Sequence, residues 1–314
     1  MKRYIFKRLL LLIPIVLGIT FLSFAMMRIA GSDAILQQVD ATGIALSQEV
    51  IDARREELGL NQPFLIQYVR WLRGFLTGDL GVSYISGNDV FSTFVSKLPA
   101  TLFLTGSSML LTVIISLPLG ILAAVRQNKF TDYLIRTSSF IGSSLPNFFV
   151  ALLLMYFLSI RLPVFPVISE GINIKSIVLP TLTLGIAMSA RYLRQIRAAV
   201  LEELGKEYVA GEKARGIEFS ATLWKSVLRS CLVTILTLMA LSIGSLLGGT
   251  AIVESIFMWD GVGKLAVDAI NMRDYPVIQA YVLWMAMIYV IVNLATDVIY
   301  RLIDPRIRLE GERR

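Results

Sequence analysis

Histidine is absent from this sequence, and Cys231 is its only cysteine. Histidine is the usual general base near neutral pH and a common ligand of transition metals, so its absence argues against both kinds of site. One cysteine cannot close an intrachain disulfide, and no cysteine pair is present to hold zinc or an iron–sulfur cluster. We therefore expect no catalytic residue, no metal site and no cofactor in this chain.

Charge is scarce as well, at 17% charged residues against 55% hydrophobic ones in a chain of 314 residues, and the mean hydropathy is +0.69. A soluble domain could not bury that much apolar surface. The charges cluster, leaving uncharged stretches near the roughly 20 residues that cross a bilayer core. The net charge of +7 then reflects basic cytoplasmic loops rather than nucleic-acid binding. The sequence predicts an all-α polytopic membrane protein with about six transmembrane helices.

Residues 1–28 are predicted to form a cytoplasmic end and the first transmembrane helix. Four basic residues precede an uncharged run from Leu9 to Met27. That run is longer than the hydrophobic region of a typical signal peptide, so we expect a retained helix. The same basic residues place the N-terminus in the cytoplasm.

Residues 29–97 are polar, and their acidic residues outnumber the basic ones, so this segment is predicted to be an extracytoplasmic helical loop. Ser47 can cap a helix that stops at Gly59, and Pro63 can open a second helix. The second helix would carry Tyr68, Leu72 and Phe75 on one face.

Residues 98–303 are predicted to hold the five remaining membrane helices, followed by a cytoplasmic tail at 304–314. The uncharged runs are Leu98–Val125, Thr137–Ile160, Ser176–Ala190, Ser230–Val253 and Tyr275–Thr296. Pro118 and Pro146 lie inside two of them and would kink the helix or break a hydrogen bond. An even number of spans places both termini in the cytoplasm.

The fourth run is short and ends at three arginines spaced three residues apart, Arg191, Arg194 and Arg197. This spacing puts them on one helical face. We interpret them as a stripe that snorkels to the inner membrane surface, with contact to a cytosolic partner or a lipid headgroup as the alternative. In the fifth run, Gly244 and Gly248 form a GxxxG pattern that lets another helix approach closely.

About 30 residues separate the fourth and fifth spans, and we assign 198–229 to a cytoplasmic loop. That length is far more than a turn between membrane helices needs, which indicates a function. Charges of alternating sign and helix-forming residues lead to Gly216. The pattern predicts one or two short exposed helices with a glycine stop.

Three short stretches in this region, Glu207-Tyr208-Val209, Ala214-Arg215-Gly216 and Leu228-Arg229-Ser230, resemble the EAA loop of ABC importer permeases. In that family the loop is a coupling helix that docks on a cytosolic ATPase and transmits its closure to the membrane helices. The resemblance implies an ATPase-coupling loop made of Glu207, Tyr208, Val209, Ala210, Glu212, Ala214, Arg215 and Gly216. Two positions depart from the family pattern: Glu212 replaces a small or basic residue, and Thr234 replaces a proline.

Five further stretches resemble the dipeptide, oligopeptide and nickel permease family, in its nickel-import branch. They are Tyr4-Ile-Phe-Lys-Arg-Leu, Leu98-Pro-Ala-Thr-Leu, Ser144-Leu-Pro-Asn-Phe, the segment from Gly248 to Gln279, and Asp304-Pro-Arg-Ile-Arg. This resemblance implies a type I ABC importer permease with an external helical insertion after the first helix. It also implies half of a translocation pathway for a nickel or metal chelate, or for a di- or oligopeptide. Because histidine is absent, any metal cargo is expected to be chelated, with bare-ion coordination by Met, Asp or Glu as the alternative.

The same resemblance implies a set of partners in the inner membrane of a bacterium or archaeon. These are a homologous second permease subunit, two cytosolic ABC ATPase subunits, an extracytoplasmic substrate-binding protein and membrane lipid, with no nucleic acid. ATP and magnesium would belong to the ATPases. Gly261-Val-Gly-Lys264 lacks the first glycine of a phosphate loop and the Ser or Thr that would hold magnesium.

A candidate pathway or gate lies near the external boundary and comprises Gly248, Gly249, Glu254, Asp260, Arg273 and Asp274. Glu254 follows a long apolar run, so it is either an interface residue or part of the substrate path. The charges between Trp259 and Asp274 indicate a gate, a docking surface for a binding protein, or ordinary loop solvation.

Two other classes of function remain as alternatives. A membrane enzyme would need paired intramembrane acids or a Ser/His arrangement, and the uncharged runs contain neither. An ion-driven secondary carrier would place ionisable groups near the midplane of repeated halves, whereas these runs are almost free of charge.

Overall fold

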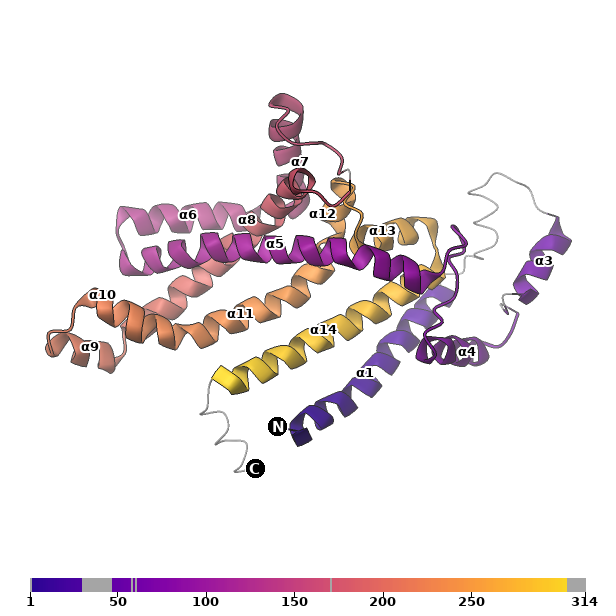
Figure 1. Ribbon diagram of the computed structural model, residues 1–314, viewed down its shortest axis with the longest axis horizontal. Helices are drawn as coiled ribbons and strands as arrows, with labels where there is room; N and C mark the ends of the chain where they lie inside the picture. Colours follow the sequence, from indigo (N-terminus) through magenta and orange to yellow (C-terminus); the bar gives the residue numbers. More distant parts are fainter. Residues whose placement is uncertain (1, 30–46, 58, 60, 170, 304–314) are drawn as a thin grey trace. The chain divides into compact units, whose positions relative to one another are not determined.

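The structure is a computed structural model that describes residues 2–29, 47–57, 59, 61–169 and 171–303 (Figure 1). Within these residues the regular secondary structure is helical, apart from an isolated antiparallel bridge between Val82 and Asp89. Most of the first part of the predicted external loop (30–46) and the tail at 304–314 lie outside the described residues.

Helices account for most of the described residues. Their bounds are α1 Lys2–Ile29, α3 Gln48–Glu57, α4 Phe64–Leu76, α5 Val90–Val125, α6 Phe130–Ser144, α7 Asn147–Met155, η1 Tyr156–Arg161, α8 Ile174–Leu204, α9 Glu207–Ala214, α10 Phe219–Ala221, η2 Thr222–Val227, α11 Leu228–Gly249, α12 Ala251–Ile256, α13 Val262–Met272 and α14 Tyr275–Ile303. The segments η1 and η2 are π-helical.

The apolar helices agree with the predicted membrane spans. Three helices among the described residues are long and apolar enough to cross a bilayer, Val90–Val125, Ile174–Leu204 and Tyr275–Ala295. Two bent pairs pass the same test if each pair is one span, and Ile13–Ile29 is a shorter apolar helix. An all-α membrane fold is therefore confirmed.

The third predicted span, Thr137–Ile160, is divided by a sharp break. The first half, α6, and the second half, which comprises α7 and η1, meet at an angle of 97°. Leu145 is extended (φ −84°, ψ 132°), which is the conformation that a following proline imposes, and Pro146 caps α7. Pro118 has a milder effect, because α5 continues through it as one helix.

The fourth and fifth spans also differ from their predicted bounds. The predicted run ends at Ala190, but α8 continues to Leu204, because the residues that follow are good helix formers. The fifth span stops at Gly249, and Thr250 separates it from the short helix α12.

The arginine stripe on α8 is not a simple snorkelling face, and this interpretation was wrong for Arg197, which is ion-paired inside the protein. Arg197 donates to both carboxylate oxygens of Asp132 at the start of α6, at 2.7 Å each, and Asp132 is fully buried. Arg194 donates to Ser143 Oγ at 2.8 Å. Two of the three arginines therefore bind α6.

The chain forms two compact units, and neither follows the predicted segment boundaries. Unit 1 comprises residues 1–101 and 260–291, and unit 2 comprises 102–259 and 292–314. The division into external loop, membrane core and tail concerns topology and stays a prediction.

Unit 1 contains the two helices predicted for the external segment. Backbone hydrogen bonds to Ser47 open α3, and Gly59 lies just beyond its end with a positive φ of 68°. Pro63 precedes α4 as predicted. Tyr68 of α4 is buried, and its hydroxyl hydrogen-bonds Thr20 of α1 at 3.0 Å.

Unit 2 has a core beneath the region between the fourth and fifth spans. Buried residues of α8, η2 and α11 form it, namely Tyr192, Ile196, Val200, Leu223, Val227, Leu228, Cys231 and Ile235, together with Ala124 of α5. The connection between α8 and α11 therefore begins and ends at helices that pack together in a hydrophobic core.

Candidate coupling site

The candidate coupling site is the connection between α8 and α11, and much of it is helical rather than loop. Of the predicted stretch 198–229, the first residues belong to α8, and the last belong to α10, η2 and α11. Only the middle of this stretch projects beyond α8 and α11. It lies at the end of α11 that is opposite α12 (Figure 1). This part contains α9, which confirms the predicted short helix.

Glu203, in the last turn of α8, fixes the beginning of α9. Tyr208 donates its hydroxyl hydrogen to Glu203 Oε2 at 2.9 Å, and the Lys206 ammonium forms an ion pair with Oε1 of the same carboxylate. Burial and the hydrogen bond to Glu203 raise the pKa of Tyr208 to about 12, so its hydroxyl keeps its proton at every physiological pH. Sequence analysis included Tyr208 but missed its partner Glu203.

Gly216 ends α9 in a Schellman motif. Gly216 N–H donates to the Lys213 carbonyl at 3.0 Å, and Ile217 N–H donates to the Glu212 carbonyl at 3.1 Å. The motif needs a left-handed residue, and Gly216 has a φ of 78°. The predicted glycine stop is confirmed, and its cause is backbone conformation.

Glu212 ties α9 to the helix that begins the fifth span. Ser226 of η2 donates its hydroxyl to Glu212 Oε1 at 2.7 Å. Hydrogen bonds from the Thr222 and Ser226 side chains lower the pKa of Glu212, because they favour its ionised form. The departure from the family pattern at this position therefore supplies a polar link between α9 and η2.

The two faces of α9 differ in character. Tyr208 and Val209 pack against the core of unit 2. Ala210, Gly211 and Ala214 are exposed on the other side, and a Cβ added at Gly211 would meet no described atom within 4 Å. The helix is thus anchored on one face and presents a small-residue surface on the other.

The candidate pathway residues of unit 2 lie at the far end of α11. Glu254 is fully buried on α12, and its N–H donates to the Thr250 carbonyl at 2.8 Å. Gly248 is exposed, and Gly249 is the last residue of α11. The structure does not bring these residues to the coupling site.

The candidate gate residues of unit 1 are not in a loop, because α13 occupies most of the stretch between Trp259 and Asp274. Asp260 is exposed and forms an ion pair with Lys97. Arg273 ends α13 with a φ of 52°. Asp274 is buried, and it accepts hydrogen bonds from the Ser83 hydroxyl and from Tyr84 N–H. Sequence analysis gave no signal for these two partners, which lie about 190 residues away.

Ligands for a metal ion are not gathered at any of these places. Among the described residues, no group of three or more His, Cys, Asp or Glu side chains could hold one.

Two family models match the chain. Residues 116–309 match the family described as binding-protein-dependent transport system inner membrane component, and residues 1–105 match the N-terminal region of such membrane components. Together they cover both the candidate coupling site and the helices α3 and α4.

Full-length relatives agree with the family models. The chain is 38% identical to the oligopeptide transport system permease protein AppB of Bacillus subtilis, over 98% of this chain and 99% of that protein. It is 34% identical to the metal-staphylopine import system permease protein CntB of Staphylococcus aureus, over 100% of both chains. It is 35% identical to the glutathione transport system permease protein GsiC of Escherichia coli, over 98% and 99%.

Solved structures share the fold at lower identity. A chain of the MetNI methionine ABC transporter, in an inward-facing conformation, superposes with a TM-score of 0.56 at 19% identity, covering 67% of this chain and 96% of that one. A chain of an amino acid ABC transporter gives a TM-score of 0.52, covering 68% and 94%.

These matches define a class of membrane protein, the inner-membrane components of binding-protein-dependent transport systems, and the chain belongs to this family. It is a multi-pass permease subunit of an ABC importer.

Proposed function

We propose that α9 is the coupling helix of this permease and that its exposed face docks on a cytosolic ATPase subunit. The observation that carries this proposal is the contrast between its two faces. Glu203 and Glu212 bind it to α8 and η2, so a push on α9 would move the helices of unit 2. Ala210, Gly211 and Ala214 leave room for another protein to approach the backbone closely.

The exposed apolar residues beside α9 support the same docking surface. Ile217 is 40% exposed, and Phe219 is 50% exposed. Such side chains next to a small-residue helix are suited to a partner that buries them. The coupling residues that carry the proposal are Glu207 to Ala210, Glu212 and Ala214 to Gly216.

The topology that follows from this role has α9 and both termini in the cytoplasm. The basic residues before the first span, between the second and third, and after the fourth all support that orientation. The external helices α3 and α4 would then face the compartment where a substrate-binding protein resides.

The complete importer would contain a homologous second permease subunit, two ATPase subunits and an extracytoplasmic binding protein. Six helices form half of a pathway, so a second permease is needed to close it. ATP and magnesium would bind the ATPases, and this chain would hydrolyse nothing itself. Glu254, Gly248 and Gly249 remain candidates for the pathway, because they lie at the end of unit 2 opposite α9.

The cargo proposed for this chain is a metal chelate, with nickel as one candidate metal, or a short peptide. Its relatives are named for oligopeptide, glutathione and metal-staphylopine transport, and these cargoes share a peptide-like backbone of modest size or a chelated metal. Mass spectrometry of the purified partner binding protein would distinguish the two, because it would show which ligand that protein carries.

Cysteine mapping tests the coupling role directly. Cys231 is 1% exposed, so the unmodified chain is the unlabelled control. Ala210→Cys should react with a membrane-impermeant maleimide only in inside-out vesicles and should cross-link to the ATPase. Ile172→Cys, on the connection between η1 and α8, should react only from the outside. Labelling of Ala210→Cys in intact cells, or its failure to cross-link to any ATPase, would refute the proposal.

A further inference from the structure

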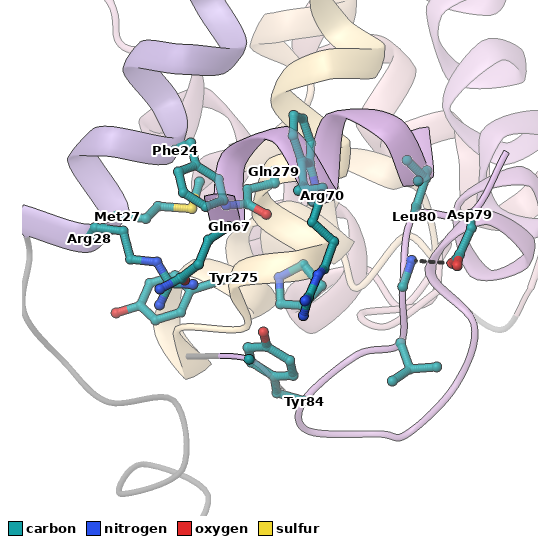
Figure 2. Close-up of a pocket in the computed structure, with 16 residues that line it drawn as sticks. Phe24, Met27, Arg28, Gln67, Arg70, Asp79, Leu80, Tyr84, Tyr275 and Gln279 are labelled. Atoms are coloured by element: carbon teal, nitrogen blue, oxygen red, sulfur yellow. Dashed lines mark hydrogen bonds between the residues drawn. The ribbon is translucent and has the colours of Figure 1, made fainter. Parts of the chain in front are cut away.

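Unit 1 contains a cavity of about 280 Å³ that the coupling site does not use. Five segments line it: the end of α1, Gly59 between α3 and α4, the helix α4, the turn at 79–84 and the beginning of α14 (Figure 2). It therefore lies at the end of α1 remote from the N-terminus, among the helices predicted to be extracytoplasmic. Its volume is close to that of a small-molecule site.

Aromatic side chains and two amide side chains, those of Gln67 and Gln279, line the cavity. Phe24 of α1 is buried, and its ring lies 6.2 Å from that of Trp71 on α4. Gln279 of α14 is 8% exposed and lines the same space. A ligand that enters would meet aromatic walls and hydrogen-bonding side chains, among them the two amides.

Two arginines from different helices stand at this cavity, Arg28 on α1 and Arg70 on α4 (Figure 2). The Arg28 guanidinium lies 5.4 Å from the centre of the Phe24 ring, so one cation borders the aromatic wall. Both arginines are exposed. Among the described residues, no carboxylate forms an ion pair with either one.

The nearby acids are already engaged. Asp79 lines the cavity, and its carboxylate accepts a hydrogen bond from Gly81 N–H at 2.8 Å (Figure 2). Asp274 is held by Ser83 and Tyr84. The described lining therefore carries two positive charges against one negative charge, an excess of +1.

A glycine makes room for one of the cations. A Cβ built on Gly59 would lie 2.5 Å from Arg70 Nη1, too close for any side chain to coexist with this arginine conformation. Gly59 also has a φ of 68°, which favours glycine. The guanidinium of Arg70 thus rests against bare backbone at the edge of the cavity.

We propose that this cavity binds a small organic carboxylate that carries an apolar group. The guanidinium groups of Arg28 and Arg70 would receive the carboxylate, since their planar forks match its two oxygens. The apolar group of the ligand would lie between Phe24 and Trp71. Any other polar atoms of the ligand would face the Gln279 amide. The mixture of an aromatic wall and two arginines selects this class over a bare metal cation or a neutral sugar.

The test uses the purified full-length chain in nanodiscs of neutral phosphatidylcholine, with N-acetylphenylalanine as the probe in a calorimetric titration. N-acetylphenylalaninamide is the matched probe without the charge. The carboxylate should bind, and the amide should bind at least about tenfold more weakly. Raising the salt concentration should weaken binding of the carboxylate, because both arginines are exposed to solvent.

Substitutions then locate the site. Arg28→Gln and Arg70→Gln should each weaken binding of N-acetylphenylalanine by about tenfold. Arg73→Gln is the matched control, because Arg73 is an exposed arginine of α4 that does not line the cavity. This control should bind like the unmodified chain. Size-exclusion elution and helical circular dichroism establish that each variant is folded.

Three outcomes would overturn the proposal. Equal binding of acid and amide would remove the role of the charge. Equal loss in Arg73→Gln and Arg28→Gln would indicate nonspecific attraction. If inorganic phosphate, or phosphatidylglycerol in the nanodisc, displaced the probe while N-acetylphenylalaninamide did not, the site would be a phosphate or lipid-headgroup site. The salt dependence of the unmodified chain decides the matter if an arginine variant does not fold.

Discussion

Arg197 and Asp132 form a two-pronged ion pair that joins α8 to α6. Both guanidinium-to-carboxylate distances are 2.7 Å, and the Asp132 side chain is fully buried while that of Arg197 is 17% exposed. Asp132 also accepts a hydrogen bond from Asn128 N–H at 2.9 Å, in the turn between α5 and α6. One carboxylate thus fixes the turn and both helices at the end of the bundle nearest α9.

Breaking this pair by removing one partner is expected to destabilise unit 2. Asp132→Asn should lower the free energy of unfolding by about 3 kcal/mol, because it leaves the Arg197 charge without its buried partner. Arg194→Gln is the control, since Arg194 is exposed and hydrogen-bonds the Ser143 hydroxyl. It should cost less than about 1 kcal/mol. Thermal unfolding in detergent measures both, and equal losses would contradict the assignment.

Gly216 is expected to tolerate only residues that accept a left-handed backbone. Gly216→Val should strain the end of α9 by about 1–2 kcal/mol and abolish transport and ATPase association, while membrane insertion stays intact. Gly216→Asn should retain most transport, because asparagine adopts this conformation more readily. Uptake assays and co-purification of the ATPase compare the two. Normal uptake by the valine variant would refute the coupling role of α9.

Much of the membrane architecture could be predicted from composition, because apolar length and flanking charge are local properties. The spans, the short helix α9, and the breaks at Gly59 and Gly216 all depend on residues adjacent in the chain. The continuation of α8 to Leu204 was missed because hydropathy indicates only where a chain leaves the apolar core of the membrane. A helix can continue beyond that boundary, as α8 does.

The partners of the charged residues could not be predicted, because they depend on packing between distant segments. The sequence offers no pattern that joins Asp132 to Arg197, or Asp274 to Ser83. Glu212 illustrates the same limit. Its side chain was noted as a departure from the family pattern. Its role follows only from the fold, which places Ser226 of η2 within hydrogen-bonding distance of the Glu212 carboxylate.

Asp274 is expected to stabilise unit 1 rather than to act as a mobile gate. Asp274→Asn keeps one oxygen acceptor but loses the charge that binds Ser83 and Tyr84, so it should cost about 1–2 kcal/mol of stability. Asp260→Asn is the matched control, because Asp260 is exposed and paired only with Lys97 in the described structure. It should cost less than about 1 kcal/mol. A transport defect of Asp274→Asn without any loss of thermal stability would favour a gate instead.

The link between Glu212 and η2 is expected to depend on pH. Since the folded-state pKa of Glu212 lies below its ordinary value of 4.5, the ionised group stabilises the attachment of α9 above that pH. This contribution should be lost as the pH falls through the lowered pKa. Hydrogen exchange of the α9 amides should therefore be steady from about pH 8 to pH 5 after correction for intrinsic rates, and should increase in more acidic buffer.

Glu212→Gln should show faster exchange that does not vary in this way, and Ser226→Ala should weaken the same protection while keeping a pH dependence. An unchanged α9 protection in both variants would show that the helix is held by Tyr208 and Val209 alone, and transmission of force through η2 would then have to be abandoned.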